Sequence, residues 1–184
     1  SVKVADGRPF RLLVVLATIT ALLSAVLDNV TTVMLIAPVT LYVASVLRVS
    51  PVPFLVGEVL ASNIGGTATL IGDPPNILIG SAAGLDFAAF LWNMTPAALL
   101  IFAAFLGCLR LFFGRSLHVQ ADVREAVLVL DEREAITDPR LLRLSLAVTT
   151  LTILGFLVHG PLGYEPATVA LLGAVVLMLL ARIH

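Results

Sequence analysis

The chain has 184 residues, of which 59% are hydrophobic and only 12% are charged, and its formal net charge is −1. Soluble domains carry about twice this share of charged residues, so the composition excludes a soluble globular domain and a disordered chain. The near-neutral charge gives no basic field for a nucleic acid, and the single cysteine excludes a disulfide framework or a cysteine metal cluster. We therefore expect an integral membrane protein whose partner is the lipid bilayer, with no nucleic acid bound.

Apolar stretches recur along the chain, and one membrane crossing needs about 20 apolar residues. The first two stretches, together residues 10–47, are joined only by Asp28-Asn29, and we interpret them as a re-entrant helical hairpin. Two full spans would return to the same side as well. The third stretch, residues 54–81, is interrupted by polar residues, which predicts a broken helix. Plain transmembrane helices are predicted for residues 87–113, 141–158 and 167–181.

The basic residues set the orientation of these segments, because cytoplasmic loops are enriched in lysine and arginine. With one broken crossing in residues 54–81, all 11 basic residues fall on one face, which we place in the cytoplasm of a cell whose inner (plasma) membrane holds the protein. Residues 114–139 are then a cytoplasmic amphipathic segment on the membrane surface. The outer loops that this topology predicts, around residues 84–86 and residues 159–166, contain no lysine or arginine.

Polar residues gather at the tip of the predicted hairpin. Asp28 or Asn29 is a suitable N-cap for a helix that begins near Val30. A buried carboxylate is costly unless it is paired, protonated or bound to a cation. The alternative to simple capping is therefore a cation or proton site at Asp28, with Asn29, Thr31 and Thr32 supplying neutral oxygens.

The interruption of the third stretch has two parts. Gly65-Gly66 allows the backbone to bend sharply and expose carbonyl groups, and Asp73 with the two prolines after it restarts a helix inside the membrane. A restarted helix points its positive end inward, and two such ends would suit an oxyanion. A plain proline kink is the alternative, but it does not explain the polar cluster before the prolines. The candidate substrate- and ion-binding residues here are Ser62, Asn63, Gly65, Gly66, Thr67, Asp73, Pro74, Pro75 and Asn76.

One acidic residue lies within the first half of the broken helix. Glu58 stands four positions before Ser62, where the sequence allows two interpretations. The side chain is either a proton carrier or a group that reaches out to the cytoplasmic interface. The sequence favours neither interpretation over the other.

At these two motifs the chain resembles the ion transporter superfamily. The motifs are Leu27-Asp28-Asn29-Val30-Thr31-Thr32 and the run from Glu58 through Asn76. The likeness is strongest to the branch with a citrate-transporter-like domain that holds arsenical pump membrane proteins, NhaD-type sodium/proton antiporters and the melanosomal P protein. It covers almost the whole chain, including residues 155–172. The resemblance implies an all-α membrane fold of two inverted repeats, each with a re-entrant hairpin and a broken helix, of which residues 1–184 form most of the first.

The resemblance also implies roles for particular residues. Asn29 would be a tip ligand for cation and substrate, and the backbone of Gly65 and Gly66 would complete a sodium site with Asp28 and Asn29. Dicarboxylate members of the superfamily have serine where this chain has Asp28 and Asp73. These departures add negative charge, which argues against a carboxylate substrate and fits the antiporter and arsenical branch.

The function that we expect is secondary active transport rather than catalysis, with no cofactor beyond sodium or a proton as the coupling ion. The substrate would be sodium exchanged for protons, arsenite or another oxyanion, carried through a midplane site by a moving hairpin and broken helix. A passive anion channel is a second hypothesis, and an intramembrane aspartyl protease using Asp28 and Asp73 is a third. We expect an interior piece of a longer protein, completed by a missing second half or a second copy, with the complete protein forming a homodimer.

Overall fold

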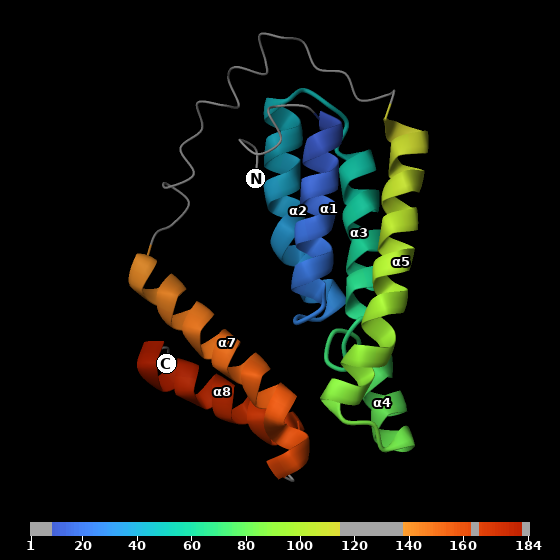
Figure 1. Cartoon of the computed structure of the whole chain (residues 1–184). Helices are drawn as coiled ribbons and strands as arrows, with labels where there is room; N and C mark the ends of the chain where they lie inside the picture. The colour runs from blue at the N-terminus through green and yellow to red at the C-terminus, as the bar shows by residue number, and fades with distance from the viewer. Residues whose placement is uncertain (1–8, 115–137, 163–165, 182–184) are drawn as a thin grey trace. The chain divides into compact units, whose positions relative to one another are not determined.

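The computed structural model describes residues 9–114, 138–162 and 166–181, and within these ranges it contains only helices and the turns between them. This confirms the all-α fold class. The chain forms two compact units. Figure 1 labels the helices, which are α1 (Pro9–Ser24), α2 (Asn29–Val46), α3 (Val52–Gly66), α4 (Pro74–Ala83), α5 (Phe87–Phe113), α7 (Pro139–Leu162) and α8 (Pro166–Ala181).

The first unit is built on α1 and α3, which run parallel with α2 antiparallel beside them (Figure 1). Their register is constant, because a side chain added at Gly57 would touch Leu13, one at Gly65 would touch Ala21, and Thr69 bonds to Ala25. Each of these contacts joins positions 44 apart. The hairpin tip therefore lies level with the end of α3.

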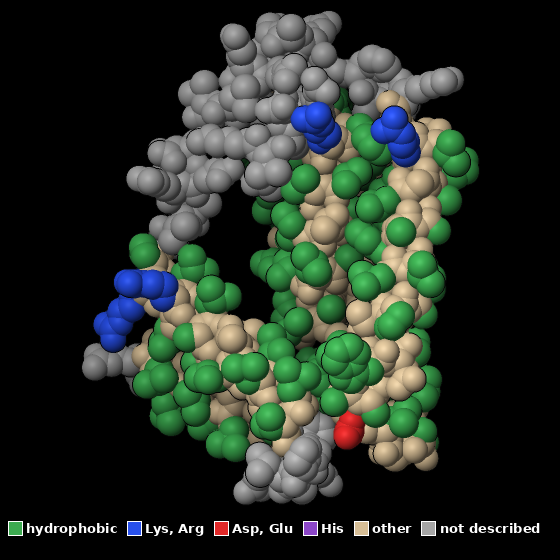
Figure 2. All heavy atoms as spheres, viewed as in Figure 1, with side chains coloured by type: hydrophobic (Ala, Val, Ile, Leu, Met, Phe, Trp, Pro, Cys, Tyr) green, Lys and Arg blue, Asp and Glu red, His purple; other side chains and the backbone are tan. Residues whose placement is uncertain are grey.

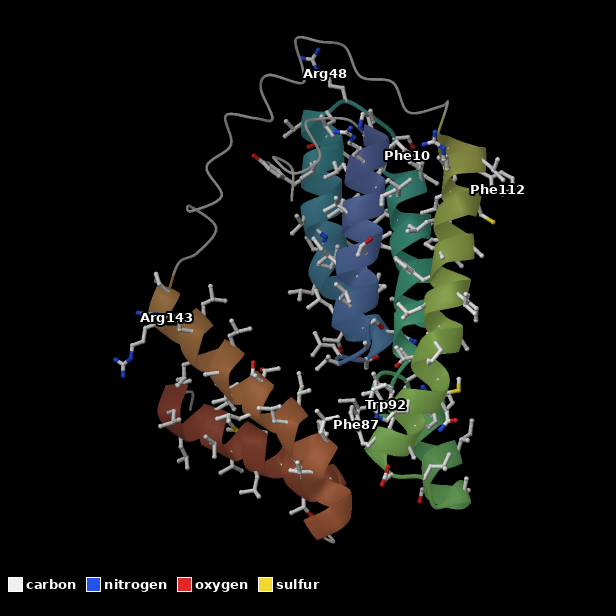
Figure 3. The ribbon with its side chains drawn as sticks, viewed as in Figure 1. Phe10, Arg48, Phe87, Trp92, Phe112 and Arg143 are labelled. Carbon is white, nitrogen blue, oxygen red and sulfur yellow. The ribbon has the colours of Figure 1, made fainter. Side chains whose placement is uncertain are left out.

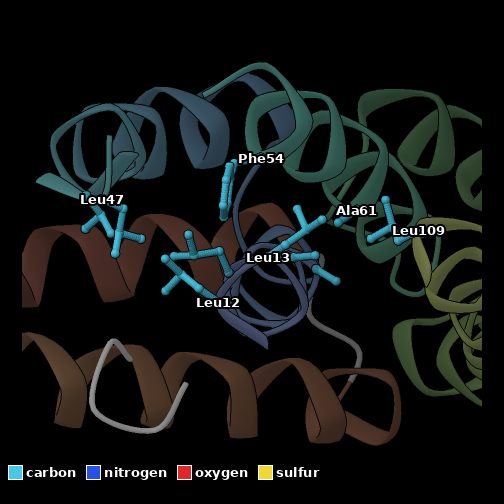
Figure 4. Close-up of a cluster of buried hydrophobic side chains, with 10 residues drawn as sticks. Leu12, Leu13, Leu47, Phe54, Ala61 and Leu109 are labelled. Atoms are coloured by element: carbon cyan, nitrogen blue, oxygen red, sulfur yellow. The ribbon is translucent and has the colours of Figure 1, made fainter. Parts of the chain in front are cut away.

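Large apolar side chains fill the space between these helices toward the end remote from the tip. Leu12, Leu13 and Leu47 are at most 2% exposed, and Phe54 packs with them at 1% exposure (Figure 4). Leu109 of α5 joins the same cluster. The hairpin, α3 and the C-terminal half of α5 therefore share one apolar core.

The broken helix consists of α3, a segment of residues 67–73, and the short helix α4. Pro74 and Pro75 begin α4, where proline is tolerated because the first turn needs no intrahelical N–H donors. Gly84 ends it with a positive φ of 65°, a conformation that favours glycine. The break thus occurs at the polar interruption that the sequence predicts.

The second unit contains α7, α8 and residues 86–89 at the start of α5. Small residues let α7 and α8 approach closely, since a side chain added at Gly155 would touch Val169 and one added at Gly173 would touch Thr152. The rings of Phe87 and Phe156 stack with centroids 5.4 Å apart.

The described surface suits a lipid environment. Three helices, α2, α5 and α7, are long and apolar enough to cross a membrane. Exposed apolar side chains are spread over the visible face of the described chain, among backbone and few charged groups (Figure 2). Trp92 and Phe112, which are 78% and 76% exposed, project from α5 near its two ends (Figure 3). Because water would penalise so much exposed apolar surface, these observations support an integral membrane protein.

The described basic side chains of the first unit lie at the end of the helices remote from the tip. Arg11 stands in the first turn of α1, Arg48 follows the C-cap residue of α2, and Arg110 is in the last turn of α5. Figure 3 shows Arg48 at this end of the unit. The basic residues that we expected in the amphipathic segment lie at residues 115–137, outside the described ranges.

The helix bounds differ from the expected segments mainly at α7. This helix continues through Leu162, so residues 159–162, which we placed in an outer loop, are helical. The helix ends directly after Gly160 and Pro161, so these helix-breaking residues act at its last turn rather than before it.

Candidate functional site

The hairpin tip is organised by a capped helix start. Asp28 is the N-cap of α2, and its two carboxylate oxygens accept from the N–H of Val30 (2.9 Å) and the N–H of Thr31 (3.2 Å). The Thr31 hydroxyl also donates to this carboxylate. The capping contact that the sequence allows is therefore present, and it fixes the carboxylate at the turn between α1 and α2.

Asn29 joins the tip to the broken helix. Its side-chain oxygen Oδ1 accepts from the Ser24 hydroxyl at the end of α1 (2.6 Å), and its Nδ2 donates to Oδ1 of Asn63 on α3 (3.4 Å). The same Oδ1 lies so close to Gly66 that an added methyl group there would collide with it. One side chain thus connects the ends of α1, α2 and α3.

The non-helical segment of residues 67–73 is fastened at both ends by side chains. The amide of Asn76, 8% exposed, donates to the carbonyl oxygens of Gly66 (3.0 Å) and Thr69 (2.9 Å). The Thr69 hydroxyl donates to the Ala25 carbonyl in the tip (2.5 Å) and accepts from the N–H of Gly72 (3.0 Å). Side-chain hydrogen bonds within the protein therefore satisfy several of the backbone groups that leave the helix here.

Glycine is required where the backbones meet. A methyl group on Gly65 would lie 2.6 Å from the carbonyl carbon of Ala21 and 2.7 Å from its Cα. On Gly66 it would lie 2.9 Å from the Gly72 carbonyl oxygen, besides striking Asn29. The two glycines therefore serve close approach of α3 to the hairpin and of the two ends of the break to each other.

The two helix starts offer few donors to an anion. At α2, the N–H groups of Val30 and Thr31 are taken by the Asp28 carboxylate. At α4, the first two residues are prolines without N–H, and the N–H of Asn76 donates to the Asp73 carbonyl (3.0 Å). This differs from the expected pair of open helix starts, and the reason is chemical: an internal carboxylate and two prolines remove the N–H groups that would hold an oxyanion.

Oxygen atoms, by contrast, converge at the end of α3. Its last carbonyls, at Asn63, Ile64, Gly65 and Gly66, each accept at least one hydrogen bond in the structure. A carbonyl oxygen has a second lone pair, and the C-terminal end of a helix carries partial negative charge. The amide oxygen of Asn29 faces this end. The junction of tip and break is therefore an electronegative environment.

The predicted site residues divide into two groups. Asn29, Asn63 and Gly66 meet directly, Asn76 reaches Gly66, and Asp28 with Thr31 forms the adjoining cap. The remaining predicted residues point elsewhere or lie apart in the described contacts. The hydroxyls of Ser62 and Thr67 donate to carbonyls of their own helix, Thr32 is buried among the helices, Pro74 and Pro75 are exposed, and Asp73 makes no side-chain capping bond.

Two contacting residues were absent from the predicted site. Ser24 donates to Asn29, and its place one residue before the tip turn could have indicated this. Thr95 of α5 donates to the Ala68 carbonyl in the break (3.3 Å), a contact 27 positions apart that no local pattern indicates. An apolar cavity of about 280 Å³ also lies beside Gly65 and Thr95, and Asp28 is not among the residues that line it.

A hairpin tip that meets a broken helix at polar, non-helical backbone is typical of secondary transporters. The whole chain, residues 1–184, matches the citrate transporter family, and the chain belongs to that family. This agrees with the resemblance to the ion transporter superfamily seen in the two motifs.

Relatives of this chain carry transporter and membrane-protein names. An uncharacterized transporter of Mycobacterium tuberculosis is 51% identical over 178 residues, which are 97% of this chain and 41% of the relative. The 46 kDa membrane protein of Mycobacterium leprae is 43% identical over 182 residues, covering 99% and 42% of the two chains. The human P protein is 42% identical over 122 residues, 63% of this chain and 15% of the relative. The chain thus spans about two fifths of the mycobacterial relatives it matches.

Proposed function

We propose that this chain contributes the cation site of a secondary active transporter that exchanges sodium or lithium for protons. The observation that carries the proposal is the gathering of oxygen atoms where the hairpin tip meets the broken helix. Oxygen atoms from Asn29, Asn63 and the end of α3 converge there, and the Asp28 carboxylate lies in the adjoining turn. Small hard cations are bound by such oxygens and by unwound backbone carbonyls.

The shortage of N–H donors at the starts of α2 and α4 argues against an oxyanion substrate and against an anion channel. An anion at the start of α2 would compete with the Asp28 carboxylate for the N–H groups of Val30 and Thr31. At the start of α4 the prolines leave only the weak helix dipole to attract it. Sodium/proton exchange is therefore favoured over arsenite or another oxyanion as the transported species.

The hairpin and α3 would move as one element in this transporter. Asn29 ties the tip to α3, Thr69 ties the break to the tip, and Gly65 brings α3 against the backbone of α1. These contacts support an elevator-like mechanism in which the site is presented alternately to each side. A second half of the transporter, or a second copy, would complete the ligands around the ion.

The re-entrant form of the hairpin is part of the proposal. Its arms of 16 and 18 residues are about 24 and 27 Å long, whereas α5, with 27 residues, is about 40 Å long. The hydrogen bond from Thr95 to Ala68, next to the Thr69 that bonds the tip, places the tip beside a residue eight positions after the start of α5. The tip would thus stop inside the thickness that α5 crosses, with the basic end of the hairpin at the cytoplasmic surface.

The test uses everted vesicles that contain the full-length protein, with sodium or lithium added to a preformed pH gradient. Asp28→Asn keeps a good N-cap but removes the charge, so we expect the gradient to persist in this variant and to relax in the wild type. Asp86→Asn is the matched control, because Asp86 caps the start of α5 (2.7 Å to the Ala89 N–H) outside the site. Relaxation unchanged in Asp28→Asn would refute the site, and uptake of arsenite without any sodium or lithium response would refute the substrate.

A further inference from the structure

A second ionisable group lies in the first unit, away from the tip. Glu58 of α3 is 0% exposed, and its Oε1 accepts from the hydroxyl of Thr40 on α2. Its Oε2 is buried and has no hydrogen-bond partner in the described part of the chain. The carboxyl group therefore does not reach out to the cytoplasmic interface, which was one of the two interpretations of the sequence.

Among the described residues, no basic side chain bonds to the Glu58 carboxyl. Arg11 of α1 is exposed in the first turn of that helix, and Tyr42 of α2 is 55% exposed. On α5, Cys108 and Arg110 are exposed as well. The partner that the structure gives to the Glu58 carboxyl is a neutral hydroxyl, that of Thr40.

An ionised carboxylate in such a place is costly, because burial removes its hydration and no cation or set of N–H donors in the described part of the chain replaces it. Protonation removes the charge while the Thr40 hydroxyl continues to bond Oε1. The unpartnered Oε2 is the atom that can carry the proton. The neutral acid is thus the form that fits this conformation.

We propose that Glu58 is the proton-binding site of the transporter, loaded in the conformation described here and emptied when water reaches its side chain. This inference rests on the proposed function, because it assigns the proton that is exchanged for the cation. The proton moves from Oε2 to water and returns from water, so that the side chain alternates between acid and carboxylate. The cation site at the tip and the proton site at Glu58 are then different residues of one moving element.

The separation of the two sites follows from the helix geometry. Asn29, Thr32 and Thr40 occupy one interior face of α2, and the Thr32 hydroxyl is also buried without a partner in the described residues. Asn29 and Thr40, which contact the two sites, are 11 residues apart on α2, about 16 Å along the helix, and Glu58 and Asn63 are five residues apart on α3, about 7.5 Å. The Glu58 carboxyl therefore does not touch the groups at the tip, and its proton exchanges with water that reaches the side chain.

Infrared difference spectroscopy of the full-length protein in lipid, between acidic and alkaline pH, tests proton binding without requiring transport. We expect a carbonyl-stretch signal of a protonated carboxylic acid that is absent in Glu58→Gln, retained in Asp86→Asn and shifted in Thr40→Val. Thr150→Val is the control for the last variant, because the Thr150 hydroxyl only bonds a carbonyl of its own helix. A spectrum of Glu58→Gln identical to wild type, or a Glu58 signal that does not change with pH, would overturn the inference.

Flux measurements in proteoliposomes then separate coupling from cation binding. We expect Glu58→Gln to lose sodium-driven relaxation of a pH gradient while it retains exchange of labelled sodium for sodium, which moves no net proton. Asp28→Asn is expected to lose both. The coupling role would be overturned if Glu58→Gln lost both the sodium-driven relaxation and the sodium-for-sodium exchange while Thr40→Val kept both activities. A titrating Glu58 signal in a wild type that exchanges no sodium would instead overturn the proposed sodium function and leave the proton site standing.

Discussion

The approach of α3 to α1 at Gly65 yields a quantitative prediction. In Gly65→Ala the new methyl group would lie 2.6 Å from the Ala21 carbonyl carbon, so the two helices must separate. Overpacking of this kind costs about 1–3 kcal/mol. Alanine also favours a helix over glycine by about 1 kcal/mol, which offsets part of that cost. The net effect on the free energy of unfolding is therefore a loss of about 0–2 kcal/mol.

A matched variant cancels the gain in helix propensity that alanine brings. Gly107 also lies inside a helix, α5, but a methyl group there would meet nothing within 4 Å. Gly107→Ala gains the same helix term without the collision, so the difference between the two variants isolates the contact at about 1–3 kcal/mol. Reversible unfolding of the purified protein in mixed detergent micelles measures this difference. Equal unfolding free energies for the two variants would refute the close approach of α1 and α3.

Two further predictions concern the break and the second unit. Asn76→Ala removes two buried hydrogen bonds, to the carbonyls of Gly66 and Thr69, and should lower the free energy of unfolding by about 1–3 kcal/mol. The control is Ser81→Ala, an exposed change in the same helix. Equal stability of the two variants would contradict the role of Asn76 in holding the non-helical segment. In a Cys108→Ala background, Gly155→Cys combined with Val169→Cys should form a disulfide that protects both thiols from maleimide. Leu154→Cys combined with Val169→Cys is the control and should form no disulfide, because Leu154 is exposed. The reverse result would contradict the packing of α7 on α8.

Much of the fold could be predicted because the polar interruptions are strong local signals. Asp28 directly before Asn29 predicts a capped helix start, and the prolines after Asp73 predict a second one. The end of α7 was less predictable, because Gly160 and Pro161 can end a helix either before or after themselves. Local propensity indicates that a helix ends in this region, but packing against neighbouring residues decides at which residue it ends.

The partners within the site were harder to predict, because they depend on the register of helices far apart in the sequence. That Asn29 meets Asn63 and Gly66 follows from how α1 packs on α3, which the motifs do not encode locally. The lack of N–H donors at the start of α4 could have been foreseen, since proline carries none. The burial of Glu58 could not, because a carboxylate on a membrane helix is compatible with either an interface or an interior position.

The depth of the hairpin tip has an electrical consequence. Because the tip lies eight residues into the 27-residue helix α5, an ion bound there is about one third of the way along that helix from its beginning. A unit charge that crosses the full membrane gains or loses about 2.3 kcal/mol per 100 mV. An ion that enters the site from the nearer side crosses about one third of the potential, which corresponds to about 0.7 kcal/mol per 100 mV. Binding from the two sides would then respond unequally to voltage, and the ratio of the two responses would report the depth of the tip.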